Sequence, residues 1–579
     1  MYDNLEIRQM TLSLKLHKNK VEQFLADNLL RLEQLDYCAA IVNPASEQLL
    51  AVGGLQDNTI KCVAVDAQQR DAQLGARIIS HLVGVAAVNG TTHLKVFTKP
   101  ENKAVFQSMG FCLVGEAPKA VFMESSTQGM ATYCRYLESL RQKGTTGVVV
   151  MNGNPFTCGH HYLVEQAAAQ VDHLFVVLVK EDRSMFSYQE RLDMAKRGCA
   201  GFDNVTVCEG SDYIISADTF PAYFIKQLSD IAETQMRLDL DIFAKHIAPA
   251  LGVSFRFVGS EPSDVLTNSY NQLMCQVFPG TRIISRLTDN DRVISASAVR
   301  CALDHSCLKE ACRWVFPTTV PFVVAHLATK ALRQELELTP KPGLVDMHDS
   351  GAHQDMDYHL MAKSISALHP FFVRLATLGH ADTLPDTDRI RAVGLEAEKA
   401  MFQATTGVNT HKGALFCMGI AVVAVAHALC TDTLAIAPVR QYIAAIAQGF
   451  GHETGTHGAE VLRRHVVQGA LDNAVNAYPM LFDQWLPFLQ SHSHEPHSLH
   501  LTLLHIMSTL DDTNVYYRAG ATKAKEVKRQ AACLRDHFSE EQMAQLNSEY
   551  ISDNISPGGS ADMLSLTIFF HSVGMACPT

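Results

Sequence analysis

The sequence lacks several features, and each absence removes a class of protein from consideration. Its 15 cysteines form no C-x-x-C pair and follow no regular spacing, so free thiols in a reducing compartment are expected. The N-terminal segment MYDNLEIRQM has no apolar core, so we expect no secretory signal and a cytoplasmic location. The formal net charge is −12 without a long basic run, so no nucleic-acid partner is expected.

Long apolar runs are also scarce, and only one run could pass for a membrane span. Residues 413–430, GALFCMGIAVVAVAHALC, are marginally long enough, are rich in small residues and include His427. A helix buried in an all-helical core has the same composition. We therefore expect a core helix and no membrane partner.

The length of 579 residues is too great for a single core. Strand and helix patterns alternate in residues 1–140 and 141–320, whereas helix-period apolar positions dominate residues 321–579. The predicted fold class is multidomain, with two α/β domains followed by an all-α domain.

A strand–loop–helix–strand pattern between residues 147 and 179 carries the first site prediction. In such a βαβ unit the loop lies at the carboxyl end of the strand, where open α/β sheets bind ligands. A glycine allows close approach of a phosphate, and a helix start offers unpaired N–H groups. A purely structural turn with a capping Thr would have the same sequence pattern. The candidate residues are Asn154, Phe156, Thr157, Gly159 and His160.

A second pattern, ISASAVR at residues 294–300, places Ser295 and Ser297 at a helix start and Arg300 one turn later. These groups suit the β- and γ-phosphates of a nucleotide. Together with T-x-G-H at residues 157–160, the pattern resembles the two signatures of the nucleotidyltransferase superfamily. The resemblance implies an HxGH-type, Rossmann-like domain over residues 141–320, with Thr157, His160 and Arg300 as catalytic residues.

Residues 1–140 resemble a GNAT-type acetyltransferase domain in their hairpin around residues 43–48, their helix over 70–83 and a late Gly110–Phe111 pair. The family's R-x-x-G-x-G/A turn keeps only its final glycine, Gly75. The bulk of Gln73 disfavours approach of a pyrophosphate. We therefore expect a docking or vestigial domain rather than an acetyl-transfer site.

Four stretches within residues 1–320 point to one particular family of that superfamily: NPFTCGHHYLVEQA, VGSEPSD, TNSYN and ISASAVR. Together they resemble citrate lyase ligase. The resemblance implies that acetate attacks the α-phosphorus of ATP, that diphosphate leaves, and that acetyl-AMP acetylates the prosthetic-group thiol of the acyl-carrier subunit of citrate lyase.

In residues 321–579 the polar side chains fall in islands between predicted helices. Carboxylates near Lys, Thr and Gly suit a magnesium–triphosphate complex, although each island alone could be a capping loop. The candidate metal ligands are Asp346, Asp355, Asp357, Asp512 and Asp562, of which Asp355, Asp357 and Asp512 are also candidate catalytic groups. The candidate nucleotide-binding residues are Lys341, His411, Lys412, Arg518, Gly558, Gly559 and Ser560.

These islands, TPKPGLVD, GAHQDMDY, GVNTHKGALF, DDTNVYYRAG and SPGGSADML, resemble triphosphoribosyl-dephospho-CoA synthase. The resemblance implies that dephospho-CoA displaces adenine from ATP. One departure is present: the family's R-G-E-A-E-x-G-F-P stretch is replaced by residues 468–473, QGALDN, and by Ala477-Tyr478-Pro479. An altered or weakened site is therefore possible on this pattern.

The sequence as a whole predicts a bifunctional enzyme with ATP and Mg²⁺ as cofactors. Its expected partners are acetate, dephospho-CoA and the acyl-carrier subunit. Two alternatives stay open: a different nucleotidyltransferase, similar to pantetheine-phosphate adenylyltransferase, or a nucleotide-binding or docking module fused to the synthase. The His-rich residues 491–498 are expected to be a solvated loop rather than a metal site.

Overall fold

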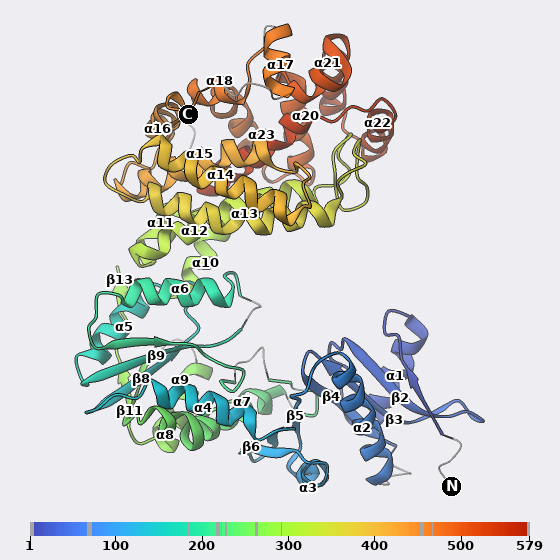
Figure 1. Ribbon diagram of the computed structural model, residues 1–579, viewed down its shortest axis with the longest axis vertical. Coiled ribbons are helices and arrows are strands. Elements are labelled where there is room, and N and C mark those ends of the chain that lie inside the picture. The colour runs from blue at the N-terminus through green and yellow to red at the C-terminus, as the bar shows by residue number, and fades with distance from the viewer. Residues whose placement is uncertain are drawn as a thin grey trace. The chain divides into compact units, whose positions relative to one another are not determined.

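The computed structural model describes residues 5–66, 72–181, 184–215, 220–221, 223–225, 228–260, 265–290, 292–451, 457–465 and 467–575. The chain forms two compact units, of which the first comprises residues 1–154 and 158–294 and the second residues 155–157 and 295–579 (Figure 1). Each unit has its own core, so each is described by itself. The domain boundaries expected near residues 140 and 320 stay predictions.

The first unit begins with a seven-stranded sheet in the order β1-β2-β3-β4-β5-β7-β6, antiparallel except for the β4–β5 pair. The predicted hairpin is present as β2 and β3. The strands are β1 Glu6–Gln9, β2 Tyr37–Asn43, β3 Gln48–Gln56, β4 Thr59–Val65, β5 Lys95–Thr98, β6 Cys112–Ala117 and β7 Ala120–Glu124. The helices are α1 Lys15–Asp27, α2 Ala72–Val88, α3 Lys103–Ser108 and α4 Gln128–Ser139. Arg70 and Asp71 of the eroded turn lie outside the described residues, and Gln73 and Gly75 lie within α2.

The same unit continues with a five-stranded sheet in the order β10-β9-β8-β11-β12, in which every pair is parallel. Its central strands are apolar and buried, as both faces of a parallel sheet require. The strands are β8 Thr146–Met151, β9 His173–Leu178, β10 Val205–Cys208, β11 Phe255–Gly259 and β12 Thr281–Ile284. The accompanying helices are α5 Cys158–Ala168, α6 Tyr188–Cys199, α7 Leu228–Ile242, α8 Ala248–Leu251 and α9 Val265–Val277, and a small hairpin follows as β13 Thr288–Asp289 and β14 Arg292–Val293.

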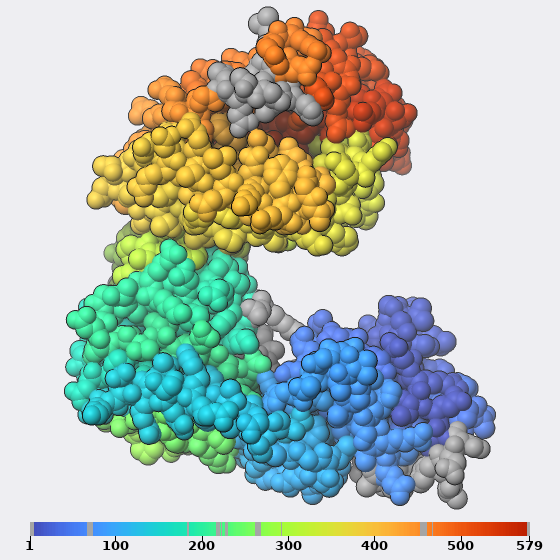
Figure 2. Space-filling model, viewed as in Figure 1, coloured from blue at the N-terminus to red at the C-terminus, as the bar shows by residue number. Residues whose placement is uncertain are grey.

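The second unit is a helical bundle, so the mixed α/β architecture followed by helices is confirmed. On the face shown in Figure 2, α13 and α14 form a large part of its surface (yellow). The helices are α10 Ala296–Asp304, α11 Leu308–Trp314, α12 Val320–Glu337, α13 Tyr358–Gly379, α14 Thr387–Ala404, α15 Lys412–Cys430, α16 Ile436–Gln448, α17 His457–Arg464, α18 Ala470–Val475, α19 Leu486–His492, α20 Ser498–Thr509, α21 Thr513–Asp536, α22 Glu540–Ser552 and α23 Gly558–Val573.

Helix α15 is the centre of this bundle. Among the described residues it is the one helix long and apolar enough to cross a membrane, and 78% of its apolar window is buried in the protein. Helices α12, α13, α14, α16 and α23 pack against it. The predicted core helix is therefore found as a core helix, and the cytoplasmic location stays a prediction.

Three polar segments expected between helices belong partly to helices. Gly558 and Gly559 lie in the first turn of α23, which Asp562 directly follows, and Arg518 lies in α21, which is kinked at Gly520, where φ is 81°. Ser491 and His492 end α19 and Ser498 begins α20, so the His-rich connection is only residues 493–497. The predicted loops were too long: α21 begins at a side-chain cap, Asp512, whereas α20 and α23 begin among polar residues without a cap of their own.

Candidate active sites

The first predicted motif lies at the switch point of the parallel sheet. Strands β8 and β11 are neighbours, and the chain continues from them toward opposite edges. The carboxyl ends of strands at such a point form the crevice where open α/β sheets bind ligands. Helix α5 begins at Cys158, so Gly159 and His160 occupy its first turn. The N-terminus of a helix at such a place carries the positive end of the helix dipole, which favours an anion.

His160 and Arg286 are two ionisable residues at this edge of the sheet, and the charge of Arg286 acts on His160. Arg286 follows β12, next to β11, and its backbone N–H donates to Ser260 Oγ at 3.3 Å. Burial, with a smaller contribution from the Arg286 guanidinium, lowers the pKa of His160 to about 4. His160 is therefore neutral at pH 7, and Arg286 provides the positive charge. Sequence reasoning missed Arg286, although its place directly after a strand is a usable signal.

Asn154 and Arg191 hold the loops of the crevice. Asn154 is buried, and its Oδ1 accepts the N–H of Phe186 at 3.2 Å. The Nη1 of Arg191 donates to O and Oδ1 of Asn152, each at 2.7 Å, and to O of Val179 at 3.0 Å. Asn152 follows β8 and Val179 follows β9, so this buried guanidinium joins the loops of two adjacent strands.

Phe156 and Thr157 belong to the second unit. Thr157 is buried and pairs with Val315 in an isolated antiparallel bridge. The Phe156 ring packs edge-on against Phe316, with ring centroids 6.2 Å apart. The segment after α11 therefore fixes these two motif residues.

The second signature forms the helix start that the sequence predicts. Ser295 caps α10, and its Oγ accepts the N–H of Ala298 at 3.1 Å. Arg300 lies one turn on, and its Nη2 donates to Ser297 Oγ at 3.1 Å. The roles of Ser295, Ser297 and Arg300 toward phosphates stay predictions.

In the helical bundle, Asp512 joins two of the polar segments. Its Oδ1 accepts the N–H groups of Asn514 and Gly559 at 3.0 and 3.3 Å. Its Oδ2 accepts the N–H and the hydroxyl of Ser560 at 2.7 and 2.9 Å. Burial raises the pKa of Asp512, while these bonds oppose that rise. Four accepted bonds leave this carboxylate little capacity for a metal ion.

The glycines of α23 fit this arrangement. A Cβ at Gly559 would lie 3.0 Å from Asp512 Oδ1, and one at Gly558 would lie 2.9 Å from Asn514 Nδ2. Small residues here let the starts of α21 and α23 approach each other.

Asp562 lies against the start of α15. A Cβ on Gly413 would lie 2.1 Å from its Oδ2, so this approach requires glycine. The backbone N–H of Ala414 favours the charged form of this carboxylate slightly. Burial, followed by the neighbouring Asp512 and Glu335, raises the pKa of Asp562 well above its usual range. The Asp562 carboxylate therefore still has lone pairs available, and a cation or a proton would offset its buried negative charge.

Lys341 is held by a protein carboxylate. Its side chain is buried, and Nζ donates to Glu335 O at 2.7 Å and to Glu335 Oε1 at 2.5 Å. Burial raises the pKa of Glu335, and Lys341 opposes that rise. Sequence reasoning missed Glu335 because it lies on the buried face of α12, which is otherwise apolar on that face.

Arg518 connects three polar segments. Its Nη1 donates to Ala352 O at 3.0 Å and to Asn554 Oδ1 at 3.1 Å, and its Nη2 to His353 Nδ1 at 3.3 Å. Because arginine can only donate, His353 carries its proton on Nε2, which lies 2.8 Å from Ser556 Oγ. Burial and the Arg518 charge lower the pKa of His353. The predicted islands around residues 352, 518 and 556 therefore meet.

Two of the other predicted carboxylates bond within their own segments, whereas Asp355 Oδ1 lies 3.8 Å from Nδ1 of His353. Asp346 accepts four hydrogen bonds within its own loop, from Thr339 Oγ1 and three backbone N–H groups. Asp357 caps α13 through the N–H of Leu360 at 2.8 Å, and Asp355 is exposed. Among the described residues, no group of three or more His, Cys, Asp or Glu side chains is arranged to hold a metal ion.

His411 directly precedes α15, and its Nδ1 lies 2.8 Å from Ser364 Oγ. Burial, with a smaller contribution from Lys341, lowers the pKa of His411 to about 4. It is therefore neutral at pH 7 and carries no positive charge for a phosphate. Lys412 is paired with Glu398, with Nζ and Oε1 3.1 Å apart.

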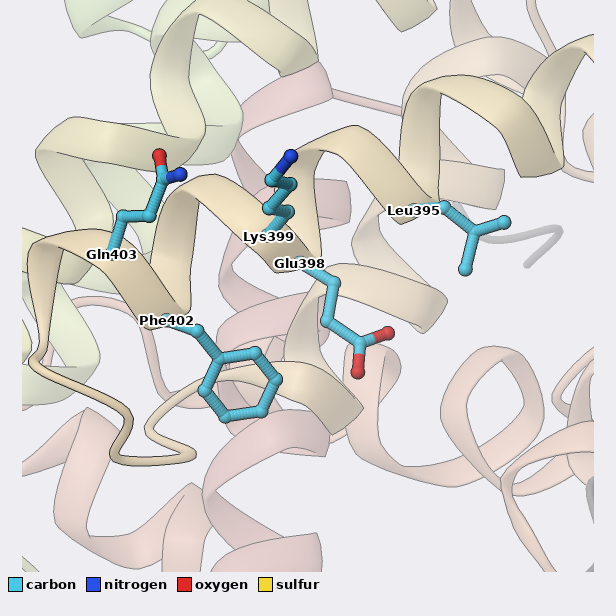
Figure 3. Close-up of a pocket in the computed structure, with 5 residues that line it drawn as sticks. All are labelled: Leu395, Glu398, Lys399, Phe402 and Gln403. Atoms are coloured by element: carbon cyan, nitrogen blue, oxygen red, sulfur yellow. The ribbon is translucent and has the colours of Figure 1, made fainter.

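Glu398 also lines a surface pocket along one face of α14, together with Leu395, Lys399, Phe402 and Gln403 (Figure 3). None of the predicted site residues lines this pocket.

Comparison with known proteins places both parts of the chain. The model of the citrate lyase ligase C-terminal domain matches residues 146–323, and that of the ATP:dephospho-CoA triphosphoribosyl transferase family matches residues 321–577. The chain therefore combines a citrate lyase ligase part with a triphosphoribosyl transferase part.

Curated relatives agree with this division. The chain is 38% identical over 334 residues to a citrate (pro-3S)-lyase ligase of Haemophilus influenzae, covering 56% of this chain and 98% of that protein. It is 33% identical over 285 residues to a 2-(5''-triphosphoribosyl)-3'-dephosphocoenzyme-A synthase of Haemophilus ducreyi, covering 43% and 88%. A crystal structure from Klebsiella pneumoniae, provisionally assigned as an acyl-CoA N-acyltransferase, covers 21% of this chain and 95% of its own at 22% identity and a TM-score of 0.18.

The chain belongs to the citrate lyase ligase family in its N-terminal part and to the triphosphoribosyl-dephospho-CoA synthase family in its C-terminal part. It is a fusion of two enzymes, as the sequence predicted.

Proposed function

We propose that the chain is a bifunctional enzyme of citrate lyase maturation. One part acetylates the prosthetic-group thiol of the acyl-carrier subunit with acetate and ATP, releasing AMP and diphosphate. The other part joins ATP and dephospho-CoA into triphosphoribosyl-dephospho-CoA and releases adenine. Membership in both families, at nearly the full length of each relative, supports the pairing.

The ligase chemistry needs positioned phosphates rather than a protein nucleophile. Acetate attacks the α-phosphorus, and negative charge grows on the leaving diphosphate. The start of α5, the neutral His160 and the charged Arg286 at the β8–β11 switch point suit that charge. Ser295, Ser297 and Arg300 are proposed to bind the outer phosphates, and an HxGH-type Rossmann-like fold is the proposed class of this domain.

The synthase chemistry is a displacement at the ribose carbon that carries adenine. The observation that carries this assignment is the meeting of the predicted polar segments at the starts of α15, α21 and α23. Asp562 is the carboxylate proposed to bind Mg²⁺, because Asp512 and Asp346 are already saturated by protein donors. Magnesium bound with a triphosphate needs only one or two carboxylates and would neutralise phosphate charge.

For residues 1–140 we propose a GNAT-like fold that serves docking. Gln73 within α2 replaces the glycine that close approach of a pyrophosphate requires.

The first experiment is incubation of the full chain with ATP, Mg²⁺ and dephospho-CoA, followed by chromatography of adenine. Adenine that forms only when dephospho-CoA is present supports the synthase, and its absence from folded protein contradicts it. Transfer of labelled acetate to the carrier subunit tests the ligase separately. Formation of dephospho-CoA from phosphopantetheine would instead support the adenylyltransferase alternative.

A further inference from the structure

The backbone at Tyr478 has an unusual conformation. Ala477 and Tyr478 both have positive φ, 59° and 47°. Non-glycine residues rarely adopt this conformation, and those that do are concentrated at functional sites. In the synthase-family pattern these positions read Gly-Phe. Relative to that pattern, this chain has alanine in place of glycine at residue 477 and adds a hydroxyl to the ring at residue 478.

The added hydroxyl is buried without a partner. Tyr478 is 2% exposed, and its Oη has no hydrogen-bond partner among the described residues. Cys417 in α15 and Asp562 in α23 are the ionisable groups that act on it, and burial with their charges raises the pKa of Tyr478. An unsatisfied buried hydroxyl weakens a fold, so its presence calls for a ligand that completes it.

His411 presents a second unsatisfied atom near the start of α15. The side chain is 4% exposed, and its Nε2 has no hydrogen-bond partner in the described part of the chain. Thr410 Oγ1 donates to Ser364 Oγ at 2.7 Å, which leaves the Ser364 hydroxyl to donate to His411 Nδ1. The Nε2 atom then carries the proton and is a donor.

Both groups belong to the neighbourhood of Asp562 and the first turns of α15. His411 directly precedes this helix, and Asp562 touches Gly413. The charges of Asp562 and Cys417 act on Tyr478. This part of the bundle thus holds two neutral hydrogen-bonding groups and the carboxylate proposed to bind the metal–triphosphate.

We propose that Tyr478 Oη and His411 Nε2 bind the adenine base of ATP in the synthase reaction, an inference that rests on the synthase function proposed above. Neutral donors suit the ring nitrogens of a purine, whereas phosphates favour charged Arg and Lys. The base is also the leaving group, so donors on its nitrogens stabilise the electron density that it gains. His411 thereby receives a different role from the phosphate contact expected from sequence.

The test compares Tyr478→Phe with the wild-type full chain. We expect kcat/KM for ATP to fall three- to tenfold, as the loss of one neutral hydrogen bond implies, while the KM for dephospho-CoA stays unchanged. The preference for ATP over purine riboside triphosphate or 7-deaza-ATP should shrink. The Tm should not fall, because the variant removes an unsatisfied buried hydroxyl. His411→Gln should change the same preference.

Tyr442→Phe is the matched control, since the Tyr442 hydroxyl is 3.1 Å from Thr433 Oγ1 beyond the opposite end of α15. It should leave the preference for ATP unchanged. The inference is overturned if Tyr478→Phe leaves the base preference intact, lowers Tm, or alters only the preference for ATP over 2'-deoxy-ATP. If the wild type releases no adenine, the proposed function fails. Calorimetric titration with adenine then tests base binding by itself. We expect adenine to bind Tyr478→Phe more weakly than the wild type, and equal binding to both, or no binding to the wild type, contradicts the inference.

Discussion

At the scale of single residues, the proposed ligase crevice combines a neutral imidazole, His160, with a guanidinium, Arg286. His160 is neutral because burial lowers its pKa to about 4, so Arg286 must supply the charge. We predict that Arg286→Gln lowers kcat for carrier acetylation on the order of a hundredfold, by analogy with removal of one transition-state donor. Adenine release should be unaffected.

Arg282 provides the control for this variant. It lies in β12 close to Arg286 but is exposed and stacks on Phe255, with its guanidinium carbon 4.8 Å from the ring centroid. Arg282→Gln should retain acetylation. Equal losses in both variants would show that only the general charge of this edge matters.

The pKa of His160 also predicts a pH dependence of stability. The unfolded imidazole titrates near 6.5 and the folded one near 4. Between these values the unfolded state binds more protons, so this contribution to stability is present above pH 6.5 and is lost as the pH falls toward 4. The expected loss between pH 7 and pH 5 is about 2 kcal/mol.

Hydrogen exchange measures this local effect. Peptides covering β8 and α5 should lose protection at pH 5 relative to pH 7, after correction for intrinsic rates. His160→Asn should remove most of the difference. An unchanged difference in the variant would assign the pH effect to other groups.

At the scale of elements, the synthase site depends on helix starts that approach each other through glycines. Alanine normally stabilises a helix interior relative to glycine by roughly 1 kcal/mol. At Gly413 its Cβ would lie 2.1 Å from Asp562 Oδ2. We therefore predict that Gly413→Ala destabilises the bundle by about 1–3 kcal/mol and lowers adenine release more than tenfold.

Gly394 in α14 offers the matched comparison, because a Cβ there meets nothing within 4 Å. Gly394→Ala should leave adenine release unchanged and should raise the thermal midpoint slightly. A harmless Gly413→Ala would mean that Asp562 can move away from α15 without consequence.

At the scale of the whole molecule, the sequence predicted the order of folds and the motif segments because both depend on local patterns. Periodicity identified α15, and the run before Asn152 identified β8. The sequence could not reveal that Glu335 neutralises Lys341 or that the charge of Arg286 acts on His160. It also could not reveal that the hydrogen-bonding capacity of Asp346 is used within its own loop. These pairings join residues through strand order and helix packing, which local periodicity does not encode.

The two parts also make a prediction about the fusion itself. The polar segments of the synthase site all lie in the second unit, whereas His160 and Arg286 lie in the first. In the function proposed above, the product of the synthase is attached to a carrier before the ligase acts on its thiol, so the synthase product is not itself a substrate of the ligase. An equimolar mixture of full-length Arg286→Gln and Gly413→Ala chains should therefore show half the wild-type rate of each reaction at equal total protein. When a carrier and a transferase are also supplied, the mixture should form acetylated carrier at the rate expected from the two halved rates. A rate far below this value would show that both activities must reside in one chain.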